Sequence, residues 1–156
     1  MTAPFPPIRR EPRAEDISLK PEDGRKAVEL VRGALPLFRA GEPIAHPDHV
    51  DVPVFYLDFA IDMIHYDGKT KMPRPRGAPP HGSAAVNRRE AREVVDRVLK
   101  EARVLDAAEF REPEDCWVVP IAWKSFIIFH VRVSREGEEL IPDYGLTEEV
   151  RRYGTF

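Results

Sequence analysis

Apolar residues recur every three to four positions in two long segments of the chain, which is the spacing of an amphipathic helix. The first segment covers residues 21–38 and the second covers residues 88–103. A glycine and a proline weaken the end of the first segment, so its regular part is expected to stop near Leu35. A third, short helix is predicted over residues 146–153. The apolar stripes consist of Ala27, Val28, Leu30, Val31, Ala34 and Leu35 in the first helix, and of Val94, Val95, Val98, Leu99 and Ala102 in the second.

Alternation of apolar and polar residues predicts strands in the remaining parts of the chain. Residues 52–66 are interpreted as one strand, because residues 55–63 alternate, although a helical stripe also fits them. The Asp67-Gly68 pair that follows is a hairpin signal and favours the strand, so residues 69–72 are expected to return beside it. Further strands are predicted at residues 117–122, 126–134 and 139–141.

The two halves of the chain share one pattern. Residues 52–61 align without gaps with residues 119–128, and the same offset aligns the two helical stripes. This likeness predicts half-repeats at about residues 21–77 and 88–145. One observation opposes duplication. The apolar face of the second copy consists of residues 127, 129, 131 and 133. The residues aligned with them, 60, 62, 64 and 66, lie on the other face of the strand predicted in the first copy. A bulge near residues 123–125 would restore the phase. Otherwise the likeness is accidental, and both interpretations remain open at this point.

The predicted order of helices and strands indicates an α+β fold. Short turns join most of the strands, so a mostly antiparallel sheet is expected, shared by both halves and covered by helices on one face. A single domain is predicted for residues 17–156. Residues 1–16 contain four prolines and little apolar surface, so they are interpreted as a flexible or docked extended arm.

Composition narrows the class of protein. The chain is 42% hydrophobic and 33% charged, as in soluble globular proteins, and no apolar run approaches the roughly 20 residues of a membrane helix. Cys116 is the one cysteine, so no internal disulfide can form, and a cytoplasmic location is expected. The net charge of −3 favours neither a nucleic acid nor a membrane as partner.

Charge is distributed unevenly between the two predicted hairpin arms. The first arm is basic and the second is acidic, which favours a non-catalytic protein-binding or accessory role through a sheet edge and these arms, with another protein or a second copy of the chain as partner. An alternative is nucleic-acid binding through the basic residues 69–89, although no aromatic residues interleave there to stack bases. The partner-binding candidates are Lys69, Lys71, Arg74 and Arg76 in the basic arm, and Glu136, Glu138 and Glu139 in the acidic arm.

A polar cleft is a further hypothesis, and it would serve an enzyme. Alternation places three polar side chains on one face of the first long strand and two on a strand of the second half. If these strands are neighbours, the side chains converge; otherwise they form an ordinary exposed sheet face with cross-strand ion pairs. The candidates are Tyr56, Asp58, Asp62, His130 and Arg132.

A metal site is the second enzymatic hypothesis. His46 and His49 are three positions apart, and Asp51 follows them closely. Imidazole and carboxylate ligands suit zinc or iron, and His65 or His81 could supply a further ligand. The alternative is a solvated polar loop. A divalent metal is therefore the one cofactor considered, and no other cofactor is predicted.

Motifs of the common enzyme classes are absent from the sequence. There is no Gly-x-Ser-x-Gly elbow and no glycine-rich phosphate loop of either type. Acidic neighbours would raise the pKa of the Cys116 thiol, which argues for a structural cysteine rather than a nucleophile. No catalytic residue is predicted, and the protein-binding role is the leading hypothesis.

Overall fold

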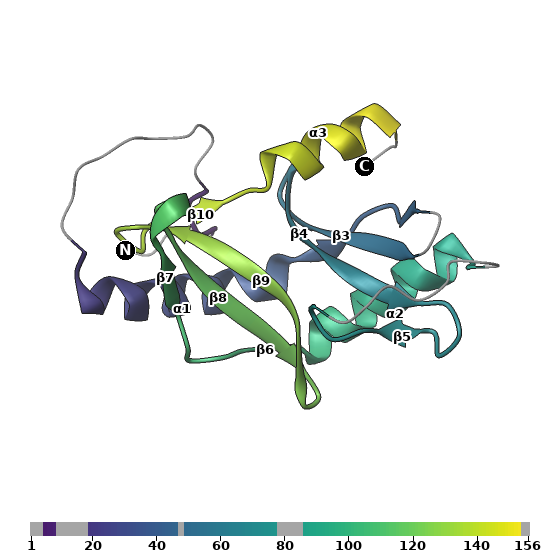
Figure 1. The fold of residues 1–156 in the computed structure, drawn as a ribbon, viewed down its shortest axis with the longest axis horizontal. Coiled ribbons are helices and arrows are strands. Elements are labelled where there is room, and N and C mark those ends of the chain that lie inside the picture. Colours follow the sequence, from purple (N-terminus) through teal and green to yellow (C-terminus); the bar gives the residue numbers. More distant parts are fainter. Residues whose placement is uncertain (1–4, 9–18, 47–48, 78–85, 154–156) are drawn as a thin grey trace.

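The computed structural model describes residues 5–8, 19–46, 49–77 and 86–153, and within them the chain forms three α-helices and two antiparallel sheets (Figure 1). The predicted α+β class is confirmed. The helices are α1 (Pro21–Ala34), α2 (Arg88–Glu101) and α3 (Tyr144–Tyr153), with short 3₁₀ helices η1 (Leu35–Leu37) and η2 (Glu112–Glu114). The regular part of the first helix therefore ends within one residue of the predicted position.

Each sheet contains five strands and belongs to one half of the chain. In the first sheet the order is β1-β3-β4-β5, and β2 also pairs with β3; in the second the order is β10-β9-β8-β6, and β7 also pairs with β8. The first sheet consists of β1 (Arg39–Ala40), β2 (Ile44–Ala45), β3 (Val50–Tyr56), β4 (Phe59–Asp67) and β5 (Met72–Pro73). The second consists of β6 (Arg103–Val104), β7 (Glu109–Arg111), β8 (Cys116–Trp123), β9 (Phe126–Ser134) and β10 (Leu140–Ile141).

The strands thus form two sheets rather than the one shared sheet that was expected. Strands β4 and β9 face each other where the sheets meet, but they do not pair through their main chains. The main-chain amide of His130 donates to the carboxylate of Asp62 at 2.9 Å. The carbonyl of Ile127 accepts from the amide of Arg76 at 2.7 Å. Because these groups already have partners, no ladder joins the sheets at this point.

The two halves repeat the same structure at a constant offset. Helix α1 starts at residue 21 and α2 at residue 88, and both are 14 residues long, so the offset is 67. Strands β4 and β9 are both nine residues long and start at residues 59 and 126, which gives the same offset. Their burial patterns differ at one position only. The structure therefore supports internal duplication.

A bulge and a turn recur at equivalent places and remove the objection to duplication. The register shifts between Val54 and Phe55 in the first sheet, and between Ile121 and Ala122 in the second. Two-residue turns follow, led by Leu57 and Lys124, which both have φ of 55°. Residues 52–66 are therefore a hairpin, which corrects the prediction of one continuous strand. The return strand that was predicted at residues 69–72 is the short strand β5, which covers Met72–Pro73.

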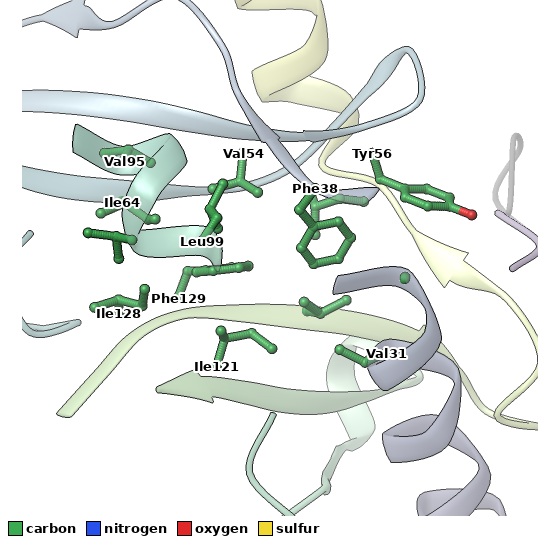
Figure 2. Packing of buried hydrophobic residues seen from close by; sticks show 14 of the residues in the cluster. Val31, Phe38, Val54, Tyr56, Ile64, Val95, Leu99, Ile121, Ile128 and Phe129 are labelled. Atoms are coloured by element: carbon green, nitrogen blue, oxygen red, sulfur yellow. The ribbon is translucent and has the colours of Figure 1, made fainter. Parts of the chain in front are cut away.

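The helices are exchanged between the halves. Helix α1 packs on strands β6, β8 and β9 of the second sheet, whereas α2 packs on β1, β3 and β5 of the first. One continuous apolar cluster fills the space between them, and Figure 2 shows side chains from both sheets and both helices meeting there. Because each half covers the sheet of the other, neither can bury its own apolar face alone.

The outer face of the first sheet, which points away from this core, carries α3. Leu146 and Val150 of α3 pack on Phe55 and Ala60. Phe55 is next to the core residue Val54, so the two side chains point to opposite faces of β3. In the helices of the described part of the chain, no segment is long and apolar enough to cross a membrane.

Part of the predicted N-terminal arm is docked on the core. Pro6 accepts a hydrogen bond from the Tyr56 hydroxyl at 2.6 Å, and Pro7 accepts one from the amide of Leu140 at 3.0 Å. Ile8 forms a parallel bridge with Leu140. The remaining residues of that prediction, 1–4 and 9–16, lie outside the described residues.

We predict that Gly24→Ala destabilises the protein by about 1–3 kcal/mol, because a Cβ there would overpack the contact between α1 and the second sheet. The added Cβ would lie 2.9 Å from Cζ3 of Trp117. The Trp117 ring is buried and donates to the carbonyl of Arg135 at 2.8 Å, so it has little freedom to move. Urea denaturation monitored by tryptophan fluorescence measures the change.

Gly33→Ala is the matched control on the same helix. A Cβ there would meet its nearest neighbour at 3.6 Å, an ordinary contact, so helix propensity should stabilise the protein by about 0.5–1 kcal/mol. Equal stabilities of the two variants would contradict the exchanged packing of α1.

Candidate metal centre

The loop between β2 and β3 brings two histidines to the outer face of the first sheet. His46 directly follows β2 and His49 directly precedes β3. The amide of His46 donates to the carbonyl of His49 at 2.8 Å, which closes the loop. Asp51 lies at the start of β3, and its cross-strand partner on β4 is His65. Directly opposed residues of antiparallel strands share a face, so the four side chains converge.

Asp51 is the centre of this cluster. Its Oδ2 atom lies 3.1 Å from Nε2 of His46 and 3.2 Å from Nε2 of His49. Its Oδ1 atom accepts a hydrogen bond from Nδ1 of His65 at 2.5 Å. The rings of His46 and His49 stack with centroids 4.4 Å apart. A carboxylate that is only 3% exposed is therefore surrounded by three imidazoles.

The surroundings keep Asp51 ionised. Burial by itself would raise the pKa of its carboxyl group, because a charge is poorly solvated inside the protein. The hydrogen bond from His65 and the attraction of the three imidazoles outweigh this effect, so the pKa of Asp51 lies below its ordinary value. The cluster thus presents a permanent negative charge beside nitrogen donors.

The spacing of three of these groups fits a tetrahedral zinc ion. Ligand bonds of about 2.0–2.2 Å place neighbouring tetrahedral ligand atoms roughly 3.3 Å apart. The two measured separations from Asp51 Oδ2 are 3.1 and 3.2 Å, and the ligand atoms of His46, His49 and Asp51 all lie within 4.8 Å of one another. His65 holds the other carboxylate oxygen, which is the usual way in which an outer residue orients a metal ligand. His81, the other donor considered from sequence, lies outside the described residues.

A pocket of about 400 Å³ adjoins the cluster. His46 lines it together with Ile44 and Val150, which give it an apolar wall. Three charged residues from different elements, namely Glu42, Arg88 and Glu149, also line it. A small molecule with an apolar body and a polar group could therefore lie next to His46.

Of the five residues predicted for a polar cleft, the structure brings three together and places two elsewhere. Asp62, His130 and Arg132 line one cavity of about 210 Å³ on the outer side of the second sheet. Tyr56 lies instead in the apolar core, where burial raises the pKa of its hydroxyl. Asp58 is exposed in the turn between β3 and β4.

The charged arms are engaged within the chain. Lys71 pairs with Glu90 at 3.2 Å, Arg76 with Asp62 at 3.0 Å, and Glu138 with Lys26 at 3.4 Å. Arg74 lies 3.8 Å from Asp67. Lys69 is exposed, and Glu136 and Glu139 also have interactions of their own. The basic and acidic arms therefore make ion pairs with other elements of the fold.

Comparison with known proteins adds no relative. No protein-family model matches the chain, and no curated protein or solved structure matches it. The function must therefore be argued from the geometry of the sites.

We predict that His130 makes the protein less stable as the pH falls. Burial and the nearby Arg76 guanidinium lower the pKa of the ring, and Arg111 adds to this effect, whereas Asp62 and Glu109 oppose it. The folded protein consequently binds fewer protons than the unfolded chain around and just below the ordinary histidine pKa of about 6.5. Stability must then decrease as the pH falls through that value.

His130→Gln removes the titrating group and serves as the comparison. Between about pH 7.5 and about pH 5, the unfolding free energy of the wild type should fall more than that of the variant. Urea denaturation at each pH measures both. A constant difference between the two proteins across this range would contradict the assignment.

Proposed function

We propose that this protein binds one Zn²⁺ ion through His46 Nε2, His49 Nε2 and Asp51 Oδ2, and that the ion serves a reaction on a small molecule in the adjoining pocket. The observation that carries the proposal is that Asp51 Oδ2 lies 3.1 and 3.2 Å from the two Nε2 atoms, close to the separation of tetrahedral ligands, with all three ligand atoms within 4.8 Å of one another.

The donor set favours zinc or a similar transition metal. Calcium and magnesium prefer six or more oxygen ligands, whereas two imidazole nitrogens and one carboxylate suit a borderline metal. All three histidines of the cluster are partly exposed, so an ion can reach them. Asp51 supplies the charge that compensates part of the ion's charge.

Three ligands are found among the described residues, and this number fits a catalytic site better than a structural one. Structural zinc sites have four protein ligands, whereas catalytic sites have three and leave one position for water or substrate. A zinc ion in such a site supplies an activated water molecule at neutral pH. Glu149 on α3 lines the same pocket and is a candidate proton acceptor, and Arg88 at the start of α2 is a candidate for orienting an anionic group.

Protein binding and nucleic-acid binding remain predictions with less support. Several charges on which they depend, such as those of Lys71, Arg76 and Glu138, already form ion pairs inside the chain. Docking to a partner through them would have to break those pairs.

We expect metal-stripped protein to bind one equivalent of Zn²⁺ and to gain thermal stability on binding, since the ion binds the folded state preferentially. His46→Ala and His49→Ala should each weaken binding by at least about 100-fold, because each removes a ligand. His65→Ala should weaken it by about 10–100-fold, because the orientation of Asp51 is lost. Isothermal titration calorimetry measures the affinities, and far-UV circular dichroism checks the fold of each variant.

His130→Ala is the matched control, since it removes a partly buried histidine that belongs neither to the cluster nor to the adjoining pocket. It should bind Zn²⁺ as the wild type does. If His130→Ala weakens binding as much as His46→Ala, or if the wild type binds no Zn²⁺, the proposed metal site is wrong.

A further inference from the structure

The second cavity occupies the position in the second half that the histidine cluster occupies in the first. The offset of 67 relates Val118 to Asp51 and Arg132 to His65, and the two pairs hold the same cross-strand register. The cavity is lined by His130 and Arg132 of β9 and by Asp143, the residue directly before α3. Duplication has therefore produced two equivalent polar faces, one rich in imidazoles and the other rich in guanidinium groups.

Two of the carboxylates that line this cavity are already satisfied. Asp62 is buried and accepts from Arg76 at 3.0 Å and from the amide of His130 at 2.9 Å. Asp143 accepts at 2.9 Å from the amide of Leu146 in the first turn of α3. Asp62 therefore balances Arg76, whereas Asp143 keeps its negative charge, because an amide hydrogen bond does not neutralise a carboxylate.

The two remaining guanidinium groups share one carboxylate. Glu114 lies 3.7 Å from Arg111 and 3.4 Å from Arg132. Strong charge-assisted hydrogen bonds are about 2.7–2.9 Å long, so both contacts are loose. The Glu114 side chain is 42% exposed, which leaves it free to turn towards solvent. Three guanidinium groups and three carboxylates line the cavity, so one positive charge is in excess once Glu114 has turned to solvent.

His130 adds a further polar group. It lines the same cavity, on the strand position two before Arg132. Residues two apart on a strand share a face, so its ring and the Arg132 guanidinium point to the same side. Three donor groups, from β7 and β9, therefore surround a space of about 210 Å³.

We propose that this cavity binds the phosphate group of a small molecule, held by Arg111 and Arg132 with the ring N–H of His130, after Glu114 has turned away. Phosphate suits the cavity because it offers several charged oxygens to several separate donors, and guanidinium groups bind it in two-point contacts. The inference goes beyond the proposed metal function and does not depend on it.

Titration of metal-stripped protein with inorganic phosphate at low ionic strength tests the proposal. The wild type should bind with a dissociation constant of about 1 mM or below, and Arg111→Gln and Arg132→Gln should each weaken binding by about tenfold. Glu114→Gln should strengthen binding several-fold, because it removes the carboxylate that competes for both arginines. Acetate should bind more weakly than phosphate to the wild type and to each variant. This comparison distinguishes recognition of phosphate from a general attraction of anions.

Arg103→Gln is the matched control, because Arg103 is exposed on β6 and does not line the cavity. It should bind phosphate as the wild type does, and so should Asp51→Asn, which removes the central ligand of the metal site. Absence of binding by both the wild type and Glu114→Gln would overturn the proposal, as would equal weakening by Arg103→Gln. Tighter binding of phosphate by Glu114→Gln is a result that a purely structural role of these arginines does not produce.

Discussion

The packing of each helix on the sheet of the opposite half is the interaction on which the rest of the structure depends. Both sheets have one apolar face, and in both cases the helix that covers it comes from the other copy. This exchange joins two similar halves into one continuous core. It also leaves the outer faces of both sheets without a helix from their own repeat. Helix α3 covers part of the first outer face, and each outer face also carries a polar cluster.

The two polar clusters show how a repeated scaffold can carry different chemistry. The same cross-strand pair holds Asp51 with His65 in one copy and Val118 with Arg132 in the other. In the first copy, a buried carboxylate must be compensated, and three imidazoles from a loop and a neighbouring strand do this. In the second copy, valine occupies the equivalent position, and Arg111 and Arg132 share the carboxylate of Glu114. The backbone thus determines where the clusters lie, and single substitutions determine their charge.

The sequence pattern predicted the helices and indicated the repeat as one of two open interpretations, but it missed the turn at Leu57-Asp58. Leu57 is apolar and continues the alternation of its neighbours, so nothing in the pattern marks the reversal of the chain. In the second copy the equivalent residues are Lys124 and Ser125, which interrupt the apolar run and reveal the turn. With the first turn missed, Asp51 and His65 could not be recognised as cross-strand neighbours. Arg111 could not be assigned to the polar cleft either, because no strand was predicted for residues 109–111, which form β7. Two predicted partners in that cleft, Asp62 and His130, do meet, because β4 and β9 lie side by side.

The exchanged helices also carry a consequence for the origin of the chain. A polypeptide containing a single repeat would have an apolar sheet face and an apolar helix that cannot cover each other within one molecule. Such an ancestor would be stable only as a homodimer in which the helix of each subunit packs on the sheet of the other. Fusion of two such genes would place both repeats in one chain, so that the exchange of helices occurs within one molecule. The two outer surfaces, identical in the ancestor, could then acquire different residues.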